Sequence, residues 1–199
     1  MSDKIRLIDV KTDDITDFKE TSILLVFPFC SGKCGKSCHN YKLIGQNNYK
    51  EYNINSIVNL YNRCSMHNAV VCAGLEPFDS FDELKLLVKQ LFLNRKKSVS
   101  LVIYTGYELS EIKNKVEQLI NLVQGYPETS KSINNKLFIK FGRYEKDKKE
   151  YWYSTFLGVE LATSNQYVIL ADSYSKTLLK QSLKGPLCET SSVDFTTCS

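Results

Sequence analysis

The sequence predicts a single α/β domain built around a mainly parallel sheet. Short, unbroken apolar runs are typical of strands covered on both faces, and they alternate with segments whose apolar residues recur at helical spacing. Their order along the chain is β-α-β-α-β-α-β, the pattern of strands joined by crossover helices. The length of 199 residues suits one domain, which buries roughly 70% of the surface of its unfolded chain.

Several segments read as strands because they are short and apolar. The expected strands are Lys4–Val10, Ser22–Phe29, Ala69–Ala73, Ser98–Tyr104, Lys136–Lys140, Phe156–Ala162 and Gln166–Leu170. The last two flank a turn at residues 163–165. A polar loop, rich in Asn and Tyr, is expected over residues 39–53.

Three segments read as helices. Asn53 is expected to cap the first, and Ser80 with Glu83 forms the capping-box pattern that opens the second, which runs to about Phe92. The third covers residues 110–124. The apolar faces expected to be buried are Ile54, Ile57, Val58 and Tyr61, then Phe81, Leu84, Leu87, Val88 and Leu91, then Ile112, Val116, Leu119, Ile120 and Val123.

Several loops with candidate functional residues follow the expected strands. In parallel sheets ligands bind at the carboxyl ends of the strands. Four segments come directly after strands: the loop that begins at Cys30, then Gly74–Pro77, Thr105–Tyr107 and Gly142–Tyr144. We therefore expect all four to share one edge of the sheet.

Charge and hydropathy limit the cellular compartments and the kinds of partner that are expected for this chain. The net charge of +4 and the pI near 8.6 are mildly basic and do not by themselves imply nucleic acid. Lysines at 33, 36, 42 and 146–149 read as solvated surface, with docking of an acidic partner or an anionic cofactor as the alternative. No secretory signal is visible and the apolar runs are far too short for a membrane span, so a reducing cytoplasm and no membrane partner are expected.

Three of the seven cysteines crowd into one loop, at Cys30, Cys34 and Cys38. In a reducing compartment, such a cluster is read as metal ligands in preference to disulfides. Three closely spaced thiolates can hold three irons of an iron–sulfur cluster and leave the fourth iron open to a substrate or cofactor. A structural zinc site completed by His39 or Cys64 is the alternative.

The segment Gly74-Leu75-Glu76-Pro77 follows the next strand. Glycine lets a backbone approach a ligand closely, and a carboxylate can accept hydrogen bonds from a ligand ammonium group. A plain strand-to-helix turn is the alternative for this segment.

These features together resemble the radical S-adenosylmethionine (SAM) superfamily, in particular the activating proteins of anaerobic ribonucleoside-triphosphate reductase. The resemblance covers about residues 20–170. It rests on FPFCSGKCGKSCHN, VVCAGLEPFDSFDEL, LVIYTGYELSEI, LFIKFGRYE and LGVELATSNQYVI. It implies an incomplete (β/α) barrel, open on one side, over residues 1–171, followed by a polar tail over residues 172–199 that contains Cys188 and Cys198.

The resemblance also implies roles for residues. The three clustered cysteines would bind a [4Fe–4S] cluster, with SAM chelating the fourth iron. The SAM-binding residues it suggests are Gly74, Leu75, Glu76, Pro77, Thr105, Arg143, Asn165 and His39. The cysteine spacing is three and three where the family commonly has three and two. Ser37 stands where the family often has an aromatic residue, so adenine recognition is expected from His39 or from backbone groups.

The function implied is a glycyl-radical activase. It would cleave SAM reductively and generate a glycyl radical on the large subunit of anaerobic (class III) ribonucleotide reductase, with a flavodoxin- or ferredoxin-type electron donor. Two alternatives remain open at this stage. One is a radical SAM enzyme that acts on another glycyl-radical enzyme or on a small molecule, and the other is a non-catalytic metal-binding interaction module.

The tryptophan, the second histidine and the cysteines outside the cluster are expected to have no functional role. Trp152 is expected in the core, Cys72 in a buried strand and Cys64 at a helix end, while His67 is expected at the surface. Cys188 and Cys198 read as free thiols in a tail without stable structure.

Overall fold

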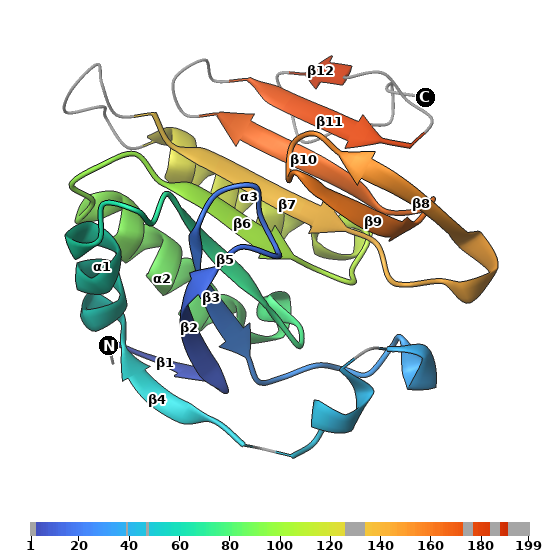
Figure 1. The fold of residues 1–199 in the computed structure, drawn as a ribbon, viewed down its shortest axis with the longest axis horizontal. Coiled ribbons are helices and arrows are strands. Elements are labelled where there is room, and N and C mark those ends of the chain that lie inside the picture. The colour runs from blue at the N-terminus through green and yellow to red at the C-terminus, as the bar shows by residue number, and fades with distance from the viewer. Residues whose placement is uncertain are drawn as a thin grey trace.

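An eight-stranded mixed sheet forms the centre of the computed structural model (Figure 1). The model describes residues 3–38, 40–46, 48–125, 134–172, 177–183 and 188–190. In spatial order the strands of this sheet are β12 (Cys188–Thr190), β11 (Leu178–Ser182), β10 (Tyr167–Asp172), β7 (Lys136–Phe141), β6 (Ser100–Tyr104), β5 (Ala69–Gly74), β3 (Ser22–Phe27) and β2 (Asp9–Asp14).

The four central strands β3, β5, β6 and β7 run parallel, as the sequence predicts. Leu25, Cys72, Ile103 and Ile139 lie in register across them. The connections between these strands contain the three predicted helices, α1 (Ile54–Arg63), α2 (Phe81–Leu93) and α3 (Leu109–Gly125). Parallel neighbours need such crossovers, and their carboxyl ends therefore lie at one edge of the sheet.

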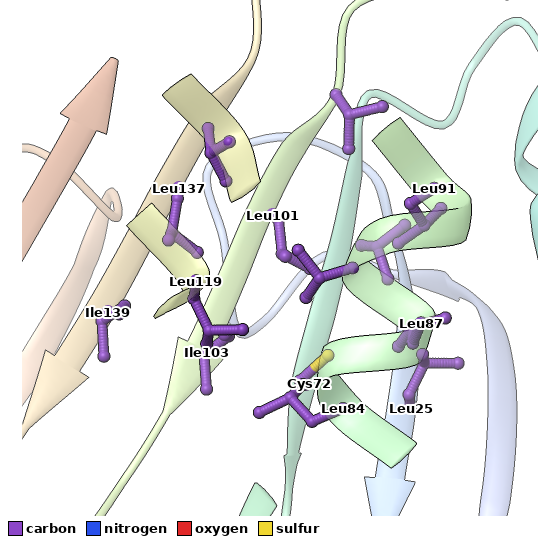
Figure 2. Close-up of a cluster of buried hydrophobic side chains, with 14 of the residues drawn as sticks. Leu25, Cys72, Leu84, Leu87, Leu91, Leu101, Ile103, Leu119, Leu137 and Ile139 are labelled. Atoms are coloured by element: carbon purple, nitrogen blue, oxygen red, sulfur yellow. The ribbon is translucent and has the colours of Figure 1, made fainter. Parts of the chain in front are cut away.

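The helices bury the faces expected of them. All the apolar positions predicted for α1 and α3 are buried, and so are those of α2 except the partly buried Phe81. Figure 2 shows the side chains of Leu84, Leu87 and Leu91 from α2 beside Cys72 and Leu101 from the strands. The predicted cap of α1 is confirmed, because Asn53 Oδ1 accepts a hydrogen bond from the Ser56 N–H at 3.2 Å.

The other face of the sheet is covered by a two-stranded ribbon, β8 (Lys149–Ser154) and β9 (Val159–Thr163). Trp152 on β8 is 7% exposed and belongs to this second apolar cluster, which confirms its predicted place in the core. Burial on both faces explains why the central strands read as unbroken apolar runs.

Four sequence-based expectations are corrected here. The run expected as one strand from Lys4 to Val10 divides into β1 (Lys4–Leu7) and β2. Within the loop expected over residues 39–53, β4 (Lys50–Asn53) pairs antiparallel with β1. Of the run expected as a strand from Phe156 to Ala162, residues 156–158 belong to a turn, and the strand begins only at Val159; this strand, β9, pairs with β8, while β10 joins the main sheet beside β7. The segment expected as a polar tail, residues 172–199, contributes β11 and β12 to the same sheet. Cys188 begins β12, in the part expected to lack stable structure, and Cys198 lies outside the described residues.

The capping box expected at α2 is also wrong. Ser80 makes no side-chain cap, and its buried hydroxyl has no hydrogen-bond partner. Glu83 instead accepts hydrogen bonds from Arg6 Nε at 2.5 Å and from the Arg6 N–H at 3.0 Å. A short 3₁₀ turn, Pro77–Ser80, leads directly into α2, and no side chain caps the start of this helix at Ser80.

His67, expected at the surface, is 3% exposed, and its Nε2 lies 3.2 Å from Asp13 Oδ1. Among the described residues, no helix is long and apolar enough to span a membrane.

Candidate metal centre

The cysteine loop begins directly after β3. Cys30, Cys34 and Cys38 are all partly buried, and a 3₁₀ turn over Gly35–Ser37 lies between the last two. Gly35 has a φ of +59°, its N–H donates to Gly32 O at 2.9 Å, and its own carbonyl accepts from the Cys38 N–H at 3.2 Å. Glycine adopts this left-handed backbone without strain, so the loop can turn tightly between two thiols.

Side chains from neighbouring strand ends hold the loop in place. Asp79 accepts hydrogen bonds from the Ser31 N–H at 2.7 Å and from the Tyr107 hydroxyl at 2.6 Å. Beyond the last cysteine, Asn40 Nδ2 donates to Gly74 O at 2.7 Å. The cysteine loop, the loop after β5 and the loop after β6 are therefore tied together, as expected from their places at strand ends.

A small pocket brings the predicted segments together. Its lining consists of Cys30, Ser31, Lys33, Cys34, Glu76, Gly106, Tyr107 and Arg143. Gly106 lies at its centre, since a Cβ there would stand 3.4 Å from Arg143 Cγ, 3.6 Å from Cys34 Sγ and 3.7 Å from Glu76 Oε2. Side chains that follow β3, β5 and β7, namely Cys34, Glu76 and Arg143, thus converge around Gly106, which follows β6.

The carboxylate of Glu76 in this pocket is fixed by three hydrogen bonds. Only 6% of it is exposed, and its carboxylate accepts from the Phe78 N–H at 3.1 Å, the Thr105 hydroxyl at 2.8 Å and the Gly106 N–H at 2.9 Å. Burial raises the pKa of Glu76 to about 7, against the effect of these three donors. The backbone of the same segment is fixed by the Leu75 N–H to Phe27 O at 3.0 Å and by the Glu76 N–H to Phe29 O at 2.7 Å.

Other predicted SAM-site residues have mainly structural contacts in this structure. The Thr105 hydroxyl donates to Glu76 and accepts from the Tyr107 N–H at 3.0 Å. Pro77 is buried at the start of the 3₁₀ turn. Asn165 Nδ2 donates to Arg143 O at 3.0 Å and to Glu145 Oε1 at 2.9 Å, which ties the late turn to the end of β7. His39 lies outside the described residues.

Arg143 reaches the pocket from the end of β7 and is ion-paired. Its Nη2 lies 2.9 Å and 2.8 Å from the two carboxylate oxygens of Glu111 on α3. Glu111 Oε1 also accepts from Lys33 Nζ at 3.1 Å. The cysteine loop, α3 and β7 therefore meet in one charged network above Cys34.

A comparison with protein families decides what kind of domain this is. The model of the 4Fe-4S single cluster domain family matches residues 21–166, well over half of the chain. The chain belongs to the 4Fe-4S single cluster domain family. Searches of curated proteins and of solved structures found no match. The matched span begins just before β3 and contains all three clustered cysteines.

The residues of this 4Fe-4S domain fit such a cluster. Thiolates are the usual ligands of iron–sulfur clusters, and the loop supplies three partly buried thiols, of which Cys34 lies beside Gly106. Burial raises the pKa of both Cys30 and Cys34, so binding of a cluster by these thiols would release protons. Cys34 interacts electrostatically with both of its partners in the loop. Among the described residues, no three His, Cys, Asp or Glu side chains gather around one point suited to a single ion; the thiolates of a cluster bind different irons.

Lys140 is a residue of the site that the sequence analysis missed. It lies on β7, is 8% exposed, and its Nζ donates to Gly142 O at 2.8 Å. Burial lowers the pKa of Lys140 to about 8, while the nearby Glu76 and Cys34 raise it. A lysine inside the apolar run LFIKF was the available signal, because charged residues are rarely buried without a specific reason.

The buried Glu76 carboxyl predicts a pH dependence of stability in the cluster-free protein. Its pKa is about 7 in the folded protein and 4.5 ordinarily, so the folded state holds an extra proton between these values. Protonated Glu76 therefore stabilises the folded state fully below about pH 4.5, and this stabilisation is lost as the pH rises through 7. The free energy of unfolding should fall by about 3 kcal/mol over this range. Urea unfolding under reducing conditions at about pH 5 and at about pH 7.5 should show this loss, and Glu76→Gln should reduce it. Equal pH dependence in the two proteins would contradict the assignment.

Proposed function

We propose that this 4Fe-4S protein is a radical SAM enzyme that generates a glycyl radical on anaerobic ribonucleotide reductase. The single observation that carries the proposal is the pocket beside Cys30 and Cys34, whose lining includes both a buried carboxylate, Glu76, and a guanidinium-bearing side chain, Arg143. A carboxylate and a guanidinium are complementary to the ammonium and carboxylate groups of an amino acid, the part of SAM that approaches a cluster.

In this proposal Cys30, Cys34 and Cys38 hold the cluster. When bound and reduced, a [4Fe–4S] cluster with one open iron supplies the electron for cleavage of the SAM sulfonium. The Glu76 carboxylate would accept a hydrogen bond from the ligand ammonium group. Its carboxylate has about four acceptor positions, and three are filled by protein donors, so one remains.

The protein also orients the ligand and excludes water. Thr105 and the Gly106 N–H fix the Glu76 carboxylate before the ligand arrives, so little reorganisation is needed on binding. Gly106 has no side chain, so nothing from this position fills the space among Cys34, Glu76 and Arg143. The parallel β3-β5-β6-β7 core would then be the incomplete (β/α) barrel of this class, with the protein substrate entering at its open side and a flavodoxin- or ferredoxin-type donor supplying electrons.

The decisive experiment measures 5′-deoxyadenosine. The protein is reconstituted anaerobically with iron and sulfide, reduced chemically and given SAM, and 5′-deoxyadenosine and methionine are quantified. Formation of both supports radical SAM chemistry; addition of an anaerobic ribonucleotide reductase should then produce the electron paramagnetic resonance signal of a glycyl radical. An intact reduced cluster that yields no 5′-deoxyadenosine, with or without the reductase, would refute the proposal.

A further inference from the structure

Two neighbouring cavities share lining side chains, and the smaller of them lies beside Cys34. The inner pocket, between the thiols and Glu76, has a volume of about 10 Å³, which is room for about one water. The outer groove along the start of α3 has a volume of about 650 Å³, within the range of small-molecule sites. Lys33 and Tyr107 line both cavities, and Glu111 lines the outer one. A ligand that moves from the groove into the inner pocket would pass these side chains.

Glu111 ties together two cationic side chains that line the inner pocket. Its carboxylate binds Lys33 from the cysteine loop and Arg143 from β7, and both cations lie over the Tyr107 ring, at 4.9 Å and 5.5 Å from its centroid. The side chains of Glu111 and Arg143 are only 29% and 22% exposed, so this pair is screened less than a typical surface pair. Their contact lowers the pKa of Glu111 to about 2 and raises that of Arg143, so both are ionised at neutral pH.

We propose that Glu111 is an internal placeholder for the carboxylate of the ligand, which takes over Arg143 as it passes from the outer groove into the inner pocket. The inference rests on the proposed function, in which that ligand is SAM. Arg143 contacts Glu111 through Nη2 alone, although a guanidinium offers a fork of donors suited to a carboxylate. A ligand carboxylate would replace one charge-assisted contact by another, while a ligand without one would break the pair with no replacement.

The exchange makes a specific prediction about affinity. Because binding must break the pair between Glu111 and Arg143, Glu111→Gln should bind SAM about three- to fivefold more tightly than the wild type. Arg143→Met should bind it about tenfold more weakly. In the double variant, the gain from Glu111→Gln should disappear, because no guanidinium remains to be released.

The measurement is equilibrium binding of SAM, and separately of decarboxylated SAM, to the anaerobically reconstituted protein. Glu51→Gln is the matched control, since Glu51 also pairs with a lysine, Lys4, but on an exposed surface away from the pocket. Decarboxylated SAM should bind Arg143→Met more tightly than the wild type, because in this variant no ion pair with Glu111 has to be broken. If the wild type binds SAM but Glu111→Gln binds it no more tightly, or if its gain persists in the double variant, the placeholder is refuted and the proposed function stands. If the cluster-loaded wild type does not bind SAM, both fall.

Discussion

Alanine at Cys30, Cys34 or Cys38 is expected to abolish assembly of the [4Fe–4S] cluster. Each thiolate would bind a different iron, and neither Cys64 nor Cys72 is placed to substitute. Cys72 faces the helices within the core, as Figure 2 shows, and burial raises the pKa of its thiol. Cys64 lies at the end of α1, on another part of the fold. The measurement is iron and acid-labile sulfide per chain after anaerobic reconstitution.

Cys64→Ala provides the matched control for this series. It removes one partly buried thiol of the same chain and should leave the iron and sulfide content unchanged. Loss of the cluster in Cys64→Ala, with full retention in Cys38→Ala, would contradict the ligand assignment. Zinc content measured on the same samples would distinguish the structural zinc site, which the sequence left as the alternative, because such a site holds zinc and no sulfide.

Gly74→Ala is expected to destabilise the fold more than any other glycine-to-alanine substitution considered below. Gly74 ends β5 with a φ of +93°, and a Cβ there would stand 2.7 Å from Val26 Cγ1 and 2.8 Å from Phe27 N. The unfavourable φ costs roughly 1–2 kcal/mol and the forced shift of β3 adds roughly 1–3, so a loss of about 3 kcal/mol is expected. The Gly74 carbonyl accepts a hydrogen bond from Asn40, which follows the cysteine loop. A shift of Gly74 should therefore disturb this loop and decrease assembly of the cluster.

Two other glycines separate the contributions to this loss. Gly45 has a φ of +77° with nothing within 4 Å of a built Cβ, so Gly45→Ala should lose only the backbone cost, about 1 kcal/mol. Gly125, at the end of α3, has neither feature, and its substitution by alanine should be neutral or slightly stabilising. Urea unfolding of the three variants measures this order. If Gly74→Ala were as stable as Gly45→Ala, β3 would shift to accommodate the new methyl group without loss of stability, and the prediction would be wrong.

Much of the scaffold and the meeting of the site's segments followed from sequence pattern. Unbroken apolar runs and helical periodicity are local properties, and the parallel arrangement of β3, β5, β6 and β7 follows from their alternation with helices. That arrangement alone brings Cys34, Glu76, Gly106 and Arg143 to one edge, as the common pocket shows. The predicted cap at Asn53 succeeded for the same reason, since its partner is only three residues away.

The failures involve partners that are distant in the chain. Glu83 reads as half of a capping box, but Arg6, 77 residues away, takes its carboxylate. The polar strand β4 has no apolar pattern to reveal it and exists because β1 pairs with it.

The sequence by itself determined the order of strands and helices, the cysteine loop and the segments that meet beside it, because these depend on local periodicity and on the geometry of parallel sheets. Only the tertiary structure decided how the charges are used: Glu76 and Lys140 are buried near each other, and Glu111 holds Lys33 and Arg143 together. A side chain's charge is visible in the sequence, but its burial and its partner are set by packing between elements distant in the chain.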